Sequence, residues 1–409
     1  MKRKGIFVLL LAGMFGVTGC GSTDVANTGA TPEQNYETEH AEIEDTEVSA
    51  YDEASETATE QEETEDTVTV VMVGDVLLHT SVAESGKKED GTYSFEHLFE
   101  HVKDDITQAD LALVNQEVII GGEELGVSGY PCFNAPYELG DALYNAGFDV
   151  VLHATNHALD KGRSGIENCL SFWKEEYPTI NVVGINGSQE AQDEICVIEK
   201  NGIRIAVLNY TYGTNGIELP ADMPYAVNLL KEDKVTSDLQ KAQEEADFTI
   251  VCPHWGTEYS LEETAEQEKW TEIFYENGAD LVIGTHPHVI EPIMWYEDEM
   301  LVYDSLGNFV NWTSGTGTGV ANRMVGGMAE VTIQKNEDGE AVITDYGIEP
   351  LVSHVESGYE GVTVYKLSDY TEELAEKNEI RKQDEAFSLD YCKNLCEEVW
   401  GEEYKESSN

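Results

Sequence analysis

Basic residues are scarce in this chain. It has 23 Lys and Arg against 81 Asp and Glu, which gives a formal net charge of -58 at pH 7. Binding to nucleic acid relies on clusters of Lys and Arg that neutralise phosphates, and the sequence offers none. We therefore expect no nucleic acid partner, whereas so acidic a chain should attract cations.

The sequence also has little that could cross a membrane. Residues 5–18, "GIFVLLLAGMFGVT", follow three basic residues and have the length of a signal-peptide core. Gly19-Cys20-Gly21 then resembles the lipobox of bacterial lipoproteins, although a plain secretory signal with an incidental Cys is the alternative. We predict a signal peptide at 1–20 and lipidation of Cys20. The protein would then be extracytoplasmic and anchored by lipid to the cell membrane.

Cysteine is infrequent and widely spaced. Of seven Cys, six follow Cys20, and their spacing shows no zinc framework apart from Cys392 and Cys396, four residues apart. A structural thiolate site is therefore not expected, and disulfide pairs cannot be assigned from the sequence.

Residues 21–66 lack Lys and Arg altogether and are rich in Asp, Glu, Thr, Ser and Ala. Such a segment cannot bury enough apolar surface to offset its ordering entropy, so we predict a disordered acidic tether. From residue 67 the pattern changes to apolar runs alternating with segments of helical period.

That alternation predicts an α/β domain over residues 67–365, and its continuous apolar strands predict sheets covered on both faces. Asn201-Gly202 between two apolar runs predicts a hairpin. Beyond residue 290 closely spaced strands predict an antiparallel section. Residues 366–409 are predicted to form a charged helical extension.

Five apolar strands end in potential metal ligands. Strand carboxyl ends share one rim of an α/β sheet, where ligands bind, so these side chains should converge if the strands are neighbours. Carboxylate, amide and imidazole groups together suit borderline divalent ions such as Mn, Fe or Zn. The candidates are Asp75 with His79, Glu117 after Asn115, Asn156 with His157, His254, and His286 with His288.

Each candidate taken alone has a simpler explanation. Asp75 could cap a helix, His79 could be an ordinary loop histidine, and Asn156-His157 with Asp160 could form a turn. His286 and His288 could be plain loop residues. Five such strand ends in one chain favour a site.

The motifs "GDVLLH", "NQE", "ATNHALDKG", "HWGTEY", "GADLVIGTHPHVIEP" and "YDSLGNFV" occur in the order seen in the bacterial CapA family of poly-gamma-glutamate capsule biosynthesis proteins. The resemblance covers residues 68–312. That family is similar in turn to the calcineurin-like metallophosphoesterases. The resemblance therefore implies a four-layer α/β/β/α sandwich of the metallophosphoesterase type, with two divalent metal ions.

The resemblance also implies roles for single residues. Asp75 matches the early metal aspartate, and His79 is the candidate for the histidine that usually follows it. Glu117 stands where a metal-bridging aspartate is common, and the remaining implied metal ligands are Asn156, His254, His286 and His288. His157, oriented by Asp160, would protonate the leaving group.

Two functional hypotheses agree with the predicted metal site and the family resemblance. One is a metal-dependent hydrolase that acts on a phosphoester or on an anionic polymer such as poly-gamma-glutamate, beside membrane-bound capsule synthesis proteins. The other is a non-catalytic factor that binds or assembles the polymer through a metal or a vestigial site. A carbohydrate-binding lipoprotein is a third reading, which leaves the five strand ends unexplained.

Overall fold

The computed structural model describes residues 66–312, 315–358 and 360–404. Cys20, the predicted signal peptide and the predicted tether up to residue 65 lie outside these described residues. Within them, no helix is both long and apolar enough to cross a membrane.

The first sheet carries the amino-terminal half of the site. Its strand order is β14-β13-β12-β1-β2-β3-β4, and β11 also pairs with β1. Strands β1 to β4 run parallel, whereas β12, β13 and β14 extend the sheet in antiparallel fashion. The bounds are β1 Thr67–Val76, β2 Leu111–Asn115, β3 Val150–Leu152, β4 Asn181–Val183, β11 Asn308–Val310, β12 Val325–Lys335, β13 Ala341–His354 and β14 Thr363–Lys366.

The second sheet has the order β5-β6-β7-β8-β10-β9. The predicted hairpin at Asn201-Gly202 is confirmed, because both residues have positive φ, 48° and 78°, and join two antiparallel strands. The bounds are β5 Cys196–Lys200, β6 Ile203–Thr211, β7 Phe248–His254, β8 Leu281–Ile283, β9 Ile293–Tyr296 and β10 Met300–Tyr303.

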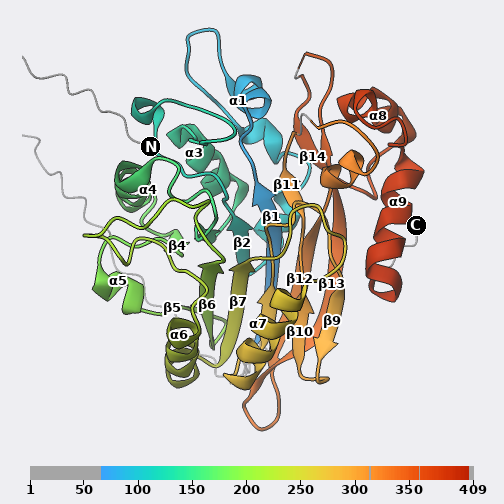
Figure 1. Cartoon of the computed structure of the whole chain (residues 1–409). Helices are drawn as coiled ribbons and strands as arrows, with labels where there is room; N and C mark the ends of the chain where they lie inside the picture. Colours follow the sequence, from blue (N-terminus) through green and yellow to red (C-terminus); the bar gives the residue numbers. More distant parts are fainter. Residues whose placement is uncertain (1–65, 313–314, 359, 405–409) are drawn as a thin grey trace, which may run out of the picture. The chain divides into compact units, whose positions relative to one another are not determined.

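The two sheets pack face to face between helices (Figure 1). Alternate side chains explain this: Val70 and Met72 of β1 lie in the core between the sheets, while Val71 and Val73 lie in the core under the first helical layer. That layer contains α1 Thr80–Gly86, α2 Lys103–Gln108, α3 Tyr137–Ala146 and α4 Gly162–Glu176. Helices α6 Glu232–Glu245 and α7 Ala265–Glu276 cover the second sheet. The predicted four-layer sandwich is confirmed.

The carboxyl-terminal segment contributes to the core between the sheets. Helix α9, Leu389–Trp400, buries Cys392, Cys396 and Trp400 there, and the Trp400 indole donates a hydrogen bond to the Glu291 carbonyl at 3.1 Å. The remaining short elements are α5 Gln189–Asp193, α8 Glu372–Lys377, η1 Glu96–Leu98, η2 Glu123–Leu125, η3 Val320–Met324, η4 Glu379–Lys382 and η5 Gly401–Glu403.

Candidate metal centre

The candidate ligands come from the carboxyl ends of strands in both sheets. Strands β1, β2 and β3 are parallel neighbours in the first sheet, and β7 and β8 are parallel neighbours in the second. Asp75 lies in β1, and Glu117 and Asn156 follow β2 and β3. His254 ends β7, and the loop after β8 carries His286 and His288. The structure therefore brings these six side chains to one buried place.

Asp75 is fully buried and holds three parts of the site together. Its Oδ1 accepts a hydrogen bond from the Asn115 amide at 2.7 Å, and its Oδ2 accepts one from the His286 backbone N–H at 3.2 Å. His288 Nδ1 lies 3.1 Å from the same Oδ2. Gly74 permits this arrangement, because a Cβ there would lie 1.9 Å from the Gly307 carbonyl oxygen.

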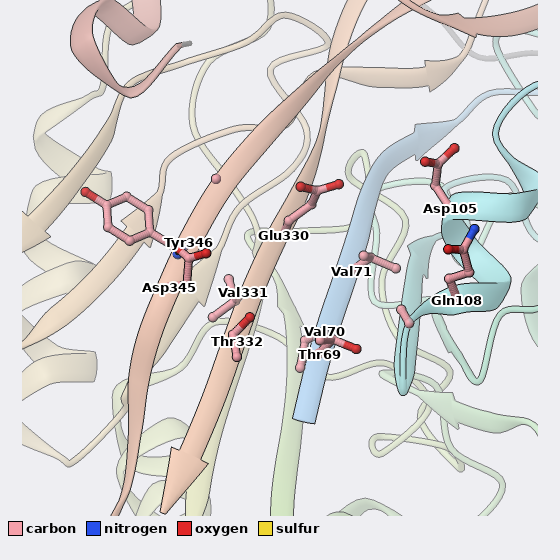
Figure 2. Close-up of a pocket in the computed structure, with 12 residues that line it drawn as sticks. Thr69, Val70, Val71, Asp105, Gln108, Glu330, Val331, Thr332, Asp345 and Tyr346 are labelled. Atoms are coloured by element: carbon pink, nitrogen blue, oxygen red, sulfur yellow. The ribbon is translucent and has the colours of Figure 1, made fainter. Parts of the chain in front are cut away.

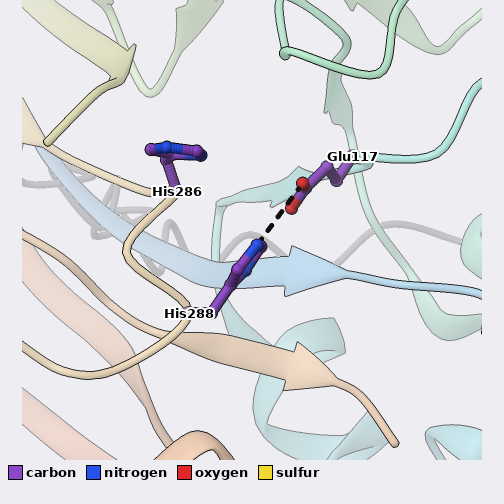
Figure 3. Close-up of side chains that lie close together, drawn as sticks. All are labelled: Glu117, His286 and His288. Carbon is purple, nitrogen blue, oxygen red and sulfur yellow. Dashed lines mark ion pairs between the residues drawn. The ribbon is translucent and has the colours of Figure 1, made fainter. Parts of the chain in front are cut away.

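Glu117 lies at the centre of the cluster. It is fully buried, and neither carboxylate oxygen has a hydrogen-bond partner. His288 Nε2 is 3.7 Å from Oε1, and His254 Nε2 is 3.9 Å from the same atom. Figure 3 marks the ion pair between Glu117 and His288 with a dashed line. A buried carboxylate that accepts no hydrogen bond costs several kcal/mol, so this geometry favours a bound cation.

Two overlapping groups have metal-ligand geometry. Glu117 forms one with His286 and His288, and the other with Asp75 and His254. In each group, one ligand atom per residue lies within 4.8 Å of the others. Glu117 is the residue that the two groups share. The residues fit a centre for divalent metal ions.

The loop after β8 has an unusual backbone conformation at its two histidines. His286 and His288 both have positive φ, 104° and 59°, a conformation that costs roughly 1–3 kcal/mol per residue. Gly284 lets the loop start, because a Cβ there would lie 2.1 Å from the Asp304 carbonyl oxygen. His286 Nδ1 is buried without a hydrogen-bond partner. Strain of this kind is retained where a side chain must point to a fixed place.

His254 links the two sheets at the site. Its Nε2 lies 3.0 Å from Asn156 Oδ1, and its Nδ1 lies 3.0 Å from Thr285 Oγ1. Both ring nitrogens therefore have a defined polar neighbour, which fixes the orientation of the imidazole.

The electrostatics of the cluster favour added positive charge. Burial raises the pKa of Glu117 well above its ordinary value. Burial alone would lower the pKa of His288, but the carboxylates of Glu117 and Asp75 outweigh it and raise that pKa to about 9. Burial, reinforced by neighbouring histidines, lowers the pKa of His254 far below its usual range and that of His286 to about 3. His254 and His286 are therefore neutral, the form in which an imidazole binds metal, whereas His288 holds a proton that a bound metal ion would displace.

His157 and Asp160 lie beside the cluster rather than in it. His157 Nδ1 is 2.7 Å from Asp160 Oδ2, which also accepts the Phe133 backbone N–H at 2.7 Å. Asp160 thus fixes the ring through Nδ1, and the second ring nitrogen, Nε2, lies 3.4 Å from the Asn215 amide nitrogen. His157 and His288 both line a cavity of about 200 Å³.

His79 is not in either ligand group. Its ring packs edge-on against Phe133, with centroids 5.2 Å apart, and it forms part of the wall of the same cavity. Burial, followed by the charges of His288 and His157, lowers its pKa to about 4. The structure therefore places His79 beside the predicted centre, in the wall of this cavity.

Sequence reasoning misses several contributors. It marks Asn115 only as a neighbour of Glu117, and it does not mark Thr285. Asn308, in the "LGN" of the motif "YDSLGNFV", donates to the His288 carbonyl at 3.0 Å. Arg323 of η3 lines the cavity although no motif marks it.

A larger groove lies elsewhere and contains none of these residues. It measures about 340 Å³ and runs over β1, β12 and β13, with Glu330 and Asp345 on the strands and Asp105 and Gln108 from α2 (Figure 2). The size of this groove does not by itself indicate a function. The buried polar atoms without hydrogen-bond partners that mark the candidate metal centre lie at the carboxyl ends of the strands, outside the groove.

The sequence profile of the family described as "Bacterial capsule synthesis protein PGA_cap" matches residues 69–313, which include every predicted metal ligand. The chain belongs to this family.

Two curated relatives share this region. The capsule biosynthesis protein CapA of Bacillus anthracis is 29% identical over 261 residues, covering 60% of this chain and 61% of the relative. The PGA biosynthesis protein CapA of Bacillus subtilis (strain 168) is 32% identical over 185 residues, covering 42% of this chain and 45% of the relative. The chain thus spans less than two thirds of the length of either relative.

Solved structures with similar folds include phosphatases. A novel phosphatase from Mycoplasma pneumoniae is 14% identical with a TM-score of 0.41, covering 70% of this chain and 94% of its own. A 5'-nucleotidase precursor from Thermus thermophilus is also 14% identical with a TM-score of 0.41, covering 70% of this chain and 54% of its own. Likeness at this level assigns no activity to the present chain.

Proposed function

We propose that this chain is a metal-dependent hydrolase that acts in the synthesis, export or anchoring of an anionic capsule polymer such as poly-gamma-glutamate. The observation that carries the proposal is Glu117. Its two buried oxygens accept no hydrogen bond, and the residue belongs to both groups of candidate ligands. The relatives named for capsule and PGA biosynthesis support the biological context.

In this proposal two divalent ions, Mn, Fe or Zn, are held by Asp75, Glu117, Asn156, His254, His286 and His288. Such ions supply Lewis-acid stabilisation of the attacked centre and lower the pKa of a water molecule. The side chains of the protein would orient the substrate and transfer a proton to it. His157, held through Nδ1 by Asp160, donates from Nε2 to the leaving group. The candidate substrates are an amide bond of the polymer or a phosphoester.

The test measures metal and turnover separately. The whole chain, purified without chelator, is compared by elemental analysis with a His286→Ala/His288→Ala variant and with His101→Ala, which changes an exposed histidine away from the cluster. We expect about two ions per wild-type chain, a loss in the double variant and no change in the control. Release of product from poly-gamma-glutamate or a phosphodiester should follow metal content.

The same experiment addresses the alternative of a polymer-binding factor. Metal retained with saturable polymer binding but no product would overturn the hydrolase and favour that factor. Equal metal content in wild type and the double variant would overturn the metal centre itself.

The proposed location is extracytoplasmic, with the chain tethered to the membrane by a lipid on Cys20. It is supported by the sequence of residues 1–21. Cys20→Ala should move the protein from the membrane pellet to the supernatant on cell fractionation. Retention of the variant in the pellet would contradict lipid anchoring at this residue.

A further inference from the structure

We infer that Arg323 and Tyr259 form a binding subsite for an anionic group of the substrate, next to the metal centre and separate from the attacked bond. The inference rests on the proposed function, which places the substrate in this cavity. The evidence for the subsite itself is the geometry of these two residues.

The guanidinium of Arg323 is stacked on the Tyr259 ring. Its Cζ lies 3.5 Å from the ring centroid, well within the range of a cation–π contact. Stacking fixes the plane of a guanidinium while its N–H groups remain directed outward around the edge. That edge matches the two oxygens of a carboxylate or phosphate.

Both residues are tied to the metal-centre loop. The Tyr259 backbone N–H donates to the Pro287 carbonyl at 2.7 Å, and the Tyr259 ring centroid is 6.1 Å from that of His288. The Arg323 carbonyl accepts from the Asn308 amide at 2.9 Å, and the same amide donates to the His288 carbonyl at 3.0 Å. Arg323 is thereby held at a fixed place relative to the predicted ligands.

Tyr259 also has a positive φ of 69°, which an aromatic residue rarely adopts. The residue remains 47% exposed although its ring is placed under the guanidinium. Backbone strain of this kind is often found at functional sites, and here it accompanies the stacking of the ring on the guanidinium.

Arg323 and Tyr259 line the same cavity as the residues of the proposed active site. Arg323, Tyr259, His157 and His288 line the same space of about 200 Å³. Among the described residues that line it, Arg323 is the sole Lys or Arg. In a chain of net charge -58, an anionic substrate meets repulsion elsewhere, so a fixed cation beside the reacting bond would select it. Glu258 also lines the cavity, and its carboxylate opposes part of this preference.

The ligand class is an oxyanion, from either a free carboxylate of a gamma-linked polymer or a second phosphate. Binding is measured by calorimetry on the whole chain, with and without Mn²⁺. The probes are a short gamma-linked glutamate oligomer, the same oligomer with its α-carboxylates amidated, and the pair glycerol 1-phosphate and glycerol. Arg323→Gln removes the charge, Arg323→Lys keeps it without the planar edge, and Tyr259→Phe keeps the stacking ring.

We expect wild type to bind the free-carboxylate oligomer about tenfold or more tightly than the amidated one. The preference should fall to less than about threefold in Arg323→Gln, be intermediate in Arg323→Lys and persist in Tyr259→Phe. Arg204→Gln is the matched control, because Arg204 pairs with Asp247 at the opposite ends of the strands and lines no part of the cavity. Thermal melting checks that each variant is folded.

The outcomes separate the subsite from the hydrolase. The same Arg323 dependence with glycerol 1-phosphate, and not with the glutamate oligomer, would support the subsite and identify its ligand as a phosphate. An unchanged preference in Arg323→Gln, or no anion preference in wild type, would overturn the subsite. Neither turnover nor bound metal is needed for this readout, so failure of the proposed hydrolase leaves the comparison intact.

Discussion

His157 Nδ1 lies 2.7 Å from Asp160 Oδ2, and the two side chains are only 8% and 2% exposed. A carboxylate in this position orients an imidazole and fixes its tautomer. The pair is therefore suited to proton transfer by His157 at the edge of the cavity.

Asp160→Asn should lower kcat on the order of 100-fold, because the amide no longer holds His157 in the tautomer and orientation that proton transfer needs. Metal content should stay at the wild-type level. Steady-state kinetics together with elemental analysis would check both. An unchanged kcat would show that the pair has only a structural role.

Glu117→Gln should separate stability from metal binding. The variant replaces a buried carboxylate that accepts no hydrogen bond with a neutral amide, so with chelator present its free energy of unfolding should equal or exceed that of wild type by an amount on the order of 1 kcal/mol. With Mn²⁺ or Zn²⁺ added, wild type should gain stability and the variant much less. Differential scanning calorimetry provides the comparison, with exposed Glu268→Gln as control. An equal gain in both proteins would exclude Glu117 as a ligand.

Glu291 predicts a pH dependence of stability away from the metal ligands. Burial raises its pKa from 4.5 to about 9, and its Oε2 accepts a 2.6 Å hydrogen bond from Gln267. The folded protein then holds a proton that the unfolded chain releases. The stabilisation is fully present below pH 4.5 and is lost as the pH rises towards 9.

Glu291→Gln mimics the protonated form, so its free energy of unfolding should exceed that of wild type increasingly at higher pH, by roughly 1–4 kcal/mol at pH 8. Urea unfolding at pH 5, 6.5 and 8 would measure this. Parallel curves for the two proteins would contradict the raised pKa.

Trp400→Ala should test whether helix α9 is part of the folded core. The side chain is 4% exposed, packs in the core between the sheets and donates to the Glu291 carbonyl. We expect a loss of roughly 3–5 kcal/mol in the free energy of unfolding. Metal content of the folded variant should not change. Urea titration beside the exposed Glu398→Ala gives the comparison, and a loss below about 1 kcal/mol would show that α9 is dispensable.

Much of the fold could be read from the chain. Continuous apolar strands alternating with helices are recognisable because a sheet buried on both faces has few polar positions to interrupt the pattern. The hairpin at Asn201-Gly202 was predictable because positive φ at both residues is an intrinsic preference. The crossing of the chain from one sheet to the other after Tyr303 was not predictable from the sequence. There the chain leaves β10 in the second sheet and enters β11 beside β1 in the first, a change of sheet that no local pattern encodes.

The candidate ligands were identifiable for the same local reason: Asp75, Glu117, His254 and the His286–His288 loop interrupt or follow apolar strands. Whether they meet was a tertiary question. Asp75 and Glu117 come from the first sheet and His254 and His286 from the second, so their convergence depends on how the sheets align face to face. The fold also left His79 in the cavity wall and brought Arg323 next to Tyr259, residues 64 positions apart in the numbering. The sequence by itself determined which side chains could bind a metal, because residue chemistry is local. Only the tertiary structure decided which of them share one site, because packing between distant segments sets those distances.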